Sequence, residues 1–286
     1  MKKSTFLHLR IPFSFFLLPV FLLACAVAET HHLAHLALAF FILHFLVYPA
    51  SNGYNSYYDK DEESIGGLKN PPKVSLELYY VSLLLDLLAL ILSLVISLEF
   101  MFMILVYGLI SKAYSHPSVR LKKYPFLGWL AAGIFQGYFT FLLSVMAVQD
   151  IGIVDTFNPT VQWPAILSSV LLLGSYPMTQ IYQHAEDGRR GDRTISRVLG
   201  VLGTFYFTAA AFTVAVAGFF YYFITFQDTL DALLFLAFLS PVLIYFGSWY
   251  LKVRKRPDAA DFAHTMKLNF ISSAMLNAFF LYLLFS

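Results

Sequence analysis

Long stretches without a charged residue constrain this chain more than any other feature. No Lys, Arg, Asp or Glu occurs between Arg197 and Asp228, and several other stretches are nearly as free of charge. Of the 286 residues, 59% are hydrophobic and only 13% are charged, whereas an ordinary soluble domain carries about 25% charged residues. This composition excludes a soluble globular enzyme and a disordered chain. The single cysteine, Cys25, excludes a disulfide scaffold.

The apolar runs have the length of membrane-spanning helices, which need roughly 20 apolar residues each. They predict nine transmembrane helices in one domain over residues 1–286, and the chain is therefore expected to be an all-α polytopic membrane protein. A transmembrane barrel is excluded, since its short strands alternate apolar and polar residues. The predicted helices lie near 11–28, 33–52, 76–97, 99–114, 126–148, 162–184, 197–225, 229–250 and 266–285.

The placement of the charges predicts the orientation. With nine spans, all 19 Lys and Arg residues fall on the side that holds the N-terminus, or at helix ends facing that side. The positive-inside rule then places the N-terminus and the basic loops in the cytoplasm and the C-terminus outside. We expect a multi-pass protein of a bacterial-type inner membrane, with its site facing the cytoplasm and with no nucleic-acid partner. The opposite side carries only acids, namely Glu29, Glu99, Asp150, Asp155, Asp228 and Asp231.

The N-terminus also permits a second interpretation. Basic residues precede an apolar stretch that ends in Leu22-Leu23-Ala24-Cys25, which is similar to a secretory signal with a lipoprotein cleavage site. We favour a first membrane helix with a buried cysteine, because a chain with so many later spans needs no cleavable signal. Cleavage at Cys25 is the alternative.

Two acidic segments, 52–63 and 183–194, fall on the predicted cytoplasmic side. If the second helix continues through the first segment, Asn52, Ser56, Asp59 and Glu63 share one face. Gln183 and Asp187 are likewise one helical turn apart. Oxygen ligands on two helix ends at the same membrane face indicate a site for a hard cation such as Mg²⁺, although their spacing equally fits acidic loops solvated beside lipid headgroups.

A third polar segment, 111–124, concentrates positive charge. Its Lys112, Arg120 and Lys122 could receive phosphate oxygens, Arg through a bidentate fork and Lys as a point charge. A plain positive-inside anchor is the alternative for these residues.

Taken together and in order, these segments resemble the motifs of the UbiA superfamily of intramembrane prenyltransferases. Residues 55–63 are similar to its Asn-Asp-x-x-Asp-x-x-x-Asp signature, and residues 183–191 to its Asp-x-x-x-Asp-x-x-x-Gly signature. Residues 114–122 are similar to the Tyr-Ser-x-Pro run of some members. The chain departs from the signatures at Ser56, Glu63 and Gln183, which stand where the family has Asp.

The resemblance implies a UbiA-like bundle of nine helices and a Mg²⁺-dependent transfer of a prenyl group. The donor would be an isoprenyl diphosphate that ionises at its allylic carbon, and the acceptor a lipophilic or aromatic molecule within the bilayer. Asp59 and Asp187 would be catalytic. The implied metal ligands are Asn55, Asp59, Glu63, Gln183 and Asp187, and the implied diphosphate ligands are Lys112, Tyr114, Arg120 and Lys122.

Two other functions remain open at this point. The departures at Ser56 and Gln183 remove negative charge and are compatible with a catalytically altered member that acts as a lipid-binding protein. An ion-coupled transporter is the other alternative, although its sites should lie near the bilayer midplane rather than at one interface.

Two further polar features have weaker functional interpretations. Asp86 lies inside the third predicted helix, where an acid is a candidate functional residue or a hydrogen-bonded interior side chain. His31, His32 and His35 have a spacing compatible with metal ligands, but they lie on the side opposite the acidic segments. We therefore interpret them as interfacial histidines.

Overall fold

The structure is a computed structural model that describes residues 1–286, and it is built from helices. Its only β-type pairing is an isolated bridge between Ile65 and Leu68, so the all-α prediction is confirmed. The α-helices are α1 (Lys3–Leu9), α2 (Leu18–Val27), α3 (Leu33–Phe41), α4 (Tyr48–Asp59), α5 (Leu76–Ser93), α6 (Leu98–Ser115), α7 (Pro125–Ile134), α8 (Thr140–Gln149), α9 (Pro159–Gln180), α10 (His184–Arg190), α11 (Ile195–Phe226), α12 (Thr229–Lys255) and α13 (Phe262–Phe285).

Seven helical segments are long and apolar enough to cross a membrane, or eight if the bent pair Lys3–Phe16 and Leu18–Val27 forms one span. The prediction of a multi-pass membrane protein is therefore confirmed, whereas nine crossings are not established. The predicted run 162–184 forms α9, which is 22 residues long but contains Pro164 and Pro177. The seven are Leu33–Asp59, Leu76–Ser93, Leu98–Ser115, Pro125–Gln149, Ile195–Phe226, Thr229–Lys255 and Phe262–Phe285.

Several of these helices begin at polar residues that cap them. The side chain of Ser97 accepts the N–H of Phe100 and separates α6 from α5. Asn158, Asp228 and Asp261 cap α9, α12 and α13 in the same way. Because a capping oxygen satisfies an N–H that the helix leaves free, these polar residues fix where the chain turns back into the bundle.

Two of the long segments contain a π-helical turn in the middle. One, Ile42–Val47, joins α3 to α4, and the other, Phe135–Phe139, joins α7 to α8. In the second, Gly137 lies so close to α9 that a Cβ there would stand 2.6 Å from backbone atoms of Ser169. Only glycine allows this approach, which lets α9 pack tightly on the interrupted helix.

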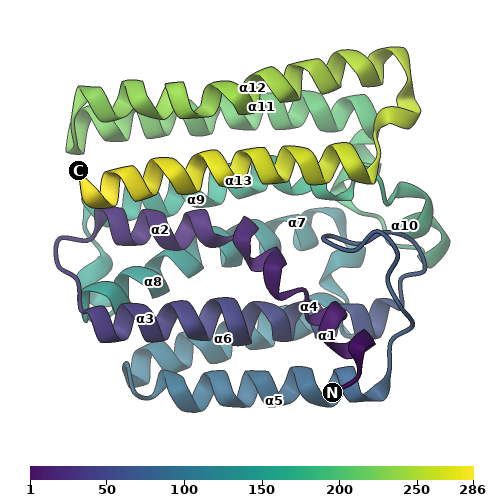
Figure 1. The fold of residues 1–286 in the computed structure, drawn as a ribbon, viewed down its shortest axis with the longest axis horizontal. Coiled ribbons are helices and arrows are strands. Elements are labelled where there is room, and N and C mark those ends of the chain that lie inside the picture. Colours follow the sequence, from purple (N-terminus) through teal and green to yellow (C-terminus); the bar gives the residue numbers. More distant parts are fainter.

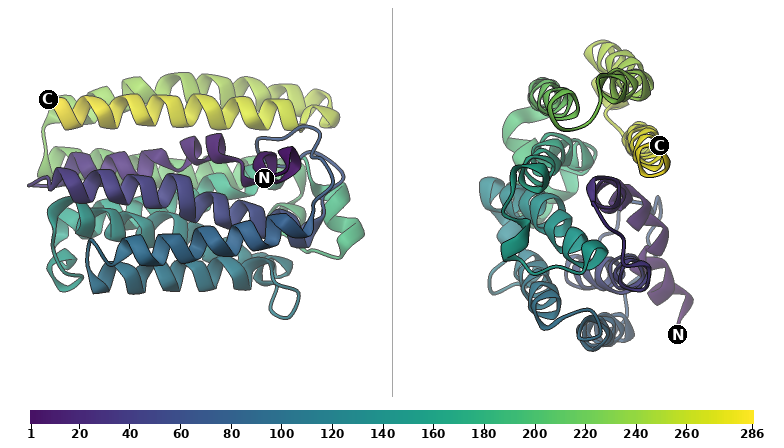
Figure 2. Two further views of the ribbon diagram at one scale, coloured as in Figure 1. Left: turned by 60° about the horizontal axis from the view of Figure 1, so that its bottom comes forward. Right: turned by 90° about the vertical axis from the view of Figure 1, so that its left-hand side faces the viewer.

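The helices lie side by side along one axis of the bundle (Figures 1 and 2). Helix α9 packs against α7 and α11, and α13 packs against α2 and α12. In Figure 1 the N-terminus, α10 and the connection from α4 to α5 gather at the right-hand end, while the C-terminus lies at the left-hand end. The two acidic segments therefore come to one end of the bundle.

Candidate functional site

The acidic segments meet because both helices that carry them end abruptly. Helix α4 ends at Asp59 because Lys60 adopts a left-handed backbone with φ of 51°. Helix α10 ends at Gly191, which has φ of 74°. The backbone N–H of Glu62 then donates to Oε1 of Glu186 at 3.0 Å, so the loop after α4 is joined directly to α10.

These two segments, with the loop after α6 and the start of the chain, enclose a polar pocket of about 190 Å³. Four aspartates and three basic residues line it, so acids and bases alternate around a small space. They are Asp59, Asp61, Asp187 and Asp192 with Arg10, Lys122 and Arg190.

Lys122 connects the loop after α6 to α4. Its ammonium contacts the Asp59 carboxylate and donates to Oδ1 of Asn55 at 3.1 Å. The hydroxyl of Ser115, at the end of α6, donates to the same Asn55 oxygen at 2.5 Å. Lys122 is buried, and a buried ammonium is tolerated only with such partners.

Arg190 is the second cation among the acids. Its guanidinium contacts Asp61 and lies 3.3 Å from Oδ1 of Asp187, while its Nε has no hydrogen-bond partner. Burial raises the pKa of Asp187 to about 6, against the lowering effect of Arg190. Burial and the nearby Asp59 raise the pKa of Asp61 as well. Both carboxylates would therefore gain from a cation that replaces their lost hydration.

Arg120 holds the fourth acid. Its Nε and Nη2 donate to the two carboxylate oxygens of Asp192 at 2.9 and 2.8 Å. This hydrogen-bonded fork raises the pKa of the Arg120 guanidinium. Nη2 of Arg120 also lies 3.7 Å from Asp59, so the arginine stands at the rim of the pocket between two acids.

A larger apolar cavity of about 590 Å³ begins where the polar pocket ends. Phe13, Tyr176 and Thr179 line both spaces. The hydroxyl of Tyr176 is bonded to that of Tyr114, which belongs to the polar pocket. Most of the other lining residues come from α9, α11, α12 and α13 and are hydrophobic. The acids thus lie at the mouth of an apolar space between the long helices.

The structure brings most of the predicted site residues together. Six line the polar pocket, and Arg120 lies against it through Asp59 and Asp192. Gln183 is among the six, and its side-chain amide donates to the carbonyl of Ser64 at 3.2 Å. The six are Asn55, Asp59, Tyr114, Lys122, Gln183 and Asp187.

Two predicted residues lie outside the pocket. A shared helical face for Asn52, Ser56, Asp59 and Glu63 requires the helix to continue through Glu63, but α4 ends at Asp59. Glu63 is half-exposed and pairs with the exposed Arg189. Lys112 is bound elsewhere, with its ammonium 2.6 Å from Asp86 and 4.9 Å from the centre of the Tyr54 ring. Asp86 is thus the partner of a lysine inside the bundle.

The predicted ligand set omits Asp61, Asp192, Arg190 and Arg10, all of which line the pocket. Three of them, Asp61, Arg190 and Asp192, belong to the two acidic segments. Their charge and their place in these segments are the sequence signal that points to them, although they do not occupy signature positions. Arg10 carries no such signal, because it reaches the site from the start of the chain, where its guanidinium donates to the carbonyl of Gly66 at 3.1 Å.

The chemistry of the pocket fits a hard divalent cation. Its lining has carboxylate, amide and hydroxyl oxygens and no histidine or cysteine, which is the donor set that Mg²⁺ prefers. Oε1 of Gln180 is buried in this lining without a hydrogen-bond partner. Asn55, Asp59, Asp61, Gln183 and Asp187 could supply the ligands.

Solved structures of other proteins share the fold of this chain. A UbiA homologue from Archaeoglobus fulgidus, bound to GPP and Mg²⁺, has a TM-score of 0.68 at 18% identity and covers 99% of this chain and 100% of its own. A UbiA homologue from Aeropyrum pernix K1 reaches 0.73 at 17% identity over 96% and 98% of the two chains. A structure described for digeranylgeranylglyceryl phosphate synthase in membranes reaches 0.63 at 20% identity over 99% of both.

These structural likenesses show a shared fold. No curated protein matches the chain in sequence. The model of the UbiA prenyltransferase family, however, matches residues 16–271, which include the three motifs, the polar pocket except Arg10 and Phe13, and most of the apolar cavity. The chain therefore belongs to the UbiA prenyltransferase family.

Proposed function

We propose that this protein transfers a prenyl group from an isoprenyl diphosphate to a lipophilic or aromatic acceptor within the membrane. The observation that carries the proposal is the junction of the two spaces at Phe13, Tyr176 and Thr179. A molecule with a charged head and a long apolar tail would place its head among the acids and bases and its tail between the helices. An allylic diphosphate has this form.

In this proposal, Asn55, Asp59 and Asp187 would hold Mg²⁺, and Asp61 would take the place of Glu63, which lies outside the pocket. Bound Mg²⁺ supplies positive charge that stabilises the diphosphate as it leaves. The presence of GPP and Mg²⁺ in the Archaeoglobus relative supports both the donor class and the metal.

The basic residues would neutralise the remaining phosphate charge. Lys122 contacts Asp59 and donates to Asn55, Nη2 of Arg120 lies 3.7 Å from Asp59, and Arg190 contacts Asp61. Because cations fixed in place before the reaction cost no reorganisation, they stabilise the leaving group more than mobile ions would.

The reaction then follows from the arrangement. The allylic C–O bond breaks, and its electron pair leaves with the diphosphate, held by the cations. The resulting carbocation forms a bond with an electron-rich carbon or oxygen of the acceptor, which loses a proton. Polar groups on the cavity wall, such as Asn52, Gln136 and Asn269, could orient the acceptor. The site would face the cytoplasm if the predicted orientation holds.

The proposal is tested by incubating membranes that contain the protein with a panel of labelled prenyl diphosphates, then measuring released diphosphate and extracting the lipid products. Asp59→Asn and Asp187→Asn should abolish turnover. Asp258→Asn is a matched control, because Asp258 is an exposed acid outside the pocket. Unchanged turnover in either site variant would contradict the mechanism. If the wild-type protein binds the donor but turns none of it over, the lipid-binding alternative is favoured.

A further inference from the structure

A second cluster of potential metal ligands lies where α3 begins and α8 ends, at the end of the bundle away from α10 (Figure 1). It consists of His32 and His35 at the start of α3 and Asp150 directly after α8. The backbone N–H of His32 donates to the carbonyl of Val148 at 2.7 Å, which fixes the two helix ends against each other. Residues far apart in the sequence thereby share one small surface.

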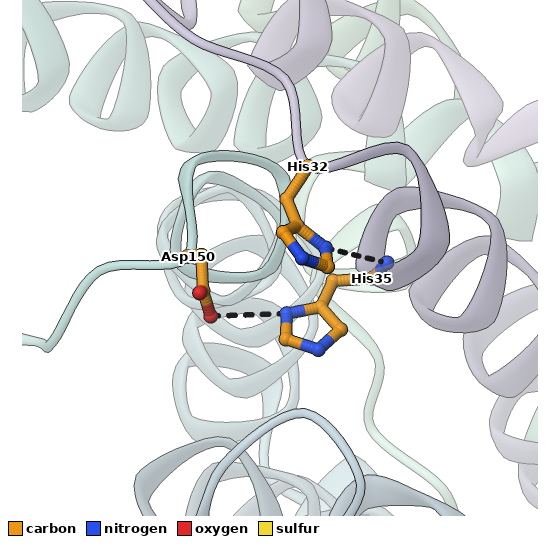
Figure 3. A group of neighbouring side chains, drawn as sticks. All are labelled: His32, His35 and Asp150. Carbon is orange, nitrogen blue, oxygen red and sulfur yellow. Dashed lines mark hydrogen bonds and ion pairs between the residues drawn. The ribbon is translucent and has the colours of Figure 1, made fainter.

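The three side chains point toward one another (Figure 3). Nδ1 of His35 lies 3.0 Å from Oδ1 of Asp150, and the centres of the two imidazole rings are 3.9 Å apart. One ligand atom from each residue lies within 4.8 Å of the other two. Metal–ligand bonds of about 2.0 Å place tetrahedral ligand atoms roughly 3.3 Å apart, so the side chains would rotate to bring their ligand atoms together. Nδ1 of His32 accepts the backbone N–H of His35 at 3.2 Å, which leaves Nε2 as its free ligand atom.

The chemistry of this cluster differs from that of the polar pocket. Two imidazoles and one carboxylate favour a borderline transition metal such as Zn²⁺, whereas the histidine-free pocket favours Mg²⁺. The side chain of Asp150 is 52% exposed and that of His35 only 16%, so the cluster has a buried wall and an open side. We propose that His32, His35 and Asp150 form a three-ligand site for a zinc-type divalent cation, with its remaining position open to solvent.

This site is separate from the prenyl-transfer site and rests on different residues. A cation bound here links the start of α3 to the end of α8, in addition to the packing of the two helices, the backbone hydrogen bond from His32 to Val148 and the contact between His35 and Asp150. Binding to the folded protein alone stabilises it by mass action. The cation therefore acts as a clamp on the far end of the bundle.

The test measures Zn²⁺ binding to the purified full-length protein in detergent, with excess Mg²⁺ present to occupy the polar pocket. His32→Ala, His35→Ala and Asp150→Asn should each weaken binding by about tenfold or more, since loss of a partner that only orients a ligand already costs that much. His31→Ala is the matched control, since the ring of His31 bonds to the carbonyl of Cys25 at 2.8 Å and lies outside the cluster. It should bind Zn²⁺ like the wild type.

Cu²⁺ used as a spectroscopic substitute distinguishes this site from an oxygen-only site. Its electron paramagnetic resonance spectrum should show coupling to imidazole nitrogens, and His35→Ala should lose part of that coupling. Equal Zn²⁺ affinity in the wild type, His32→Ala and His35→Ala, or a spectrum with oxygen ligands alone, overturns the proposal. His32 is exposed, but its ring also caps α3, and loss of a cap costs roughly 0.5–2 kcal/mol. Thermal unfolding without metal therefore has to show that His32→Ala is folded before its Zn²⁺ affinity is compared.

Discussion

The ammonium of Lys122 contacts the carboxylate of Asp59, a residue 63 positions away in the sequence. Both side chains are more than nine-tenths buried. Removing one partner of a buried ion pair leaves the other charge uncompensated, so the contact couples the position of the basic loop to the acids of α4. It also places a cation where a diphosphate would enter.

Lys122→Gln should therefore raise KM for the isoprenyl diphosphate by about tenfold or more, the effect of losing a charge-assisted hydrogen bond. Steady-state kinetics with a labelled donor measure this change. Lys123→Gln is the matched control, because Lys123 is exposed and does not line the pocket. Equal KM values for the two variants would contradict the proposed role of Lys122.

Arg190 is expected to act as a fixed cation that reduces the need for metal. Arg190→Gln should weaken binding of inorganic pyrophosphate in the presence of a chelator by about tenfold. The same variant should bind Mg²⁺ more tightly without pyrophosphate, because Asp61 and Asp187 lose a competing positive charge. Titration calorimetry measures both affinities.

In Arg190→Gln, weaker pyrophosphate binding together with tighter Mg²⁺ binding would indicate that Arg190 binds the anion. If Arg190 only maintained the structure of the pocket, the substitution would lower both affinities. Arg189→Gln is the control, since Arg189 pairs with Glu63 at the exposed surface. Arg190→Lys keeps a positive charge and should restore part of the pyrophosphate affinity. A loss of Mg²⁺ affinity in a folded Arg190→Gln protein would argue against the prediction.

The depth of the apolar cavity should determine the longest prenyl chain that the protein accepts in its donor. Ala217 lines it on α11, eight residues or about 12 Å further along the helix than Ala209. Ala217→Phe should reduce turnover of long prenyl diphosphates and spare short ones, because the ring fills the distal part of the space. Product analysis across a chain-length series tests this.

Ala210→Phe offers the comparison for this series. Ala210 is on the same helix, is exposed and does not line the cavity. It should leave the chain-length preference as in the wild type. If Ala217→Phe also leaves it unchanged, the donor tail occupies a different space.

Stability should depend on pH through Asp187. Its pKa rises from 3.8 to about 6 on folding, mainly because of burial. Between pH 3.8 and about pH 6, Asp187 keeps its proton in the folded protein and releases it in the unfolded chain. The contribution of Asp187 to the free energy of unfolding is therefore present below pH 3.8 and lost as the pH rises through about 6.

Asp187→Asn removes this dependence. Without divalent cations, its unfolding temperature should fall less between about pH 4 and about pH 7 than that of the wild type. The corresponding difference in the free energy of unfolding is on the order of 3 kcal/mol near neutral pH. Thermal unfolding in detergent measures it. A parallel fall in both proteins would show that the folded-state proton belongs to another group.

The helices were largely predictable from local sequence, because an apolar run of this length has few other stable forms in a membrane. The residues at which the helices end were less predictable. Helix α4 contains no Gly or Pro at its end that would signal a stop, yet Lys60 turns it. Because of that turn, Asp61 lines the pocket, whereas the predicted ligand Glu63 lies outside it and pairs with Arg189.

By itself, the sequence determined the helical membrane character of the protein and the segments that line the polar pocket. These follow from hydrophobicity and from spacing along the chain, which are local properties. The tertiary structure decided which charges meet: Lys122 with Asp59, Arg190 with Asp61, and Lys112 with Asp86 away from the pocket. Such pairs depend on how helices distant in sequence pack, since a buried charge is stable only where packing brings it a partner.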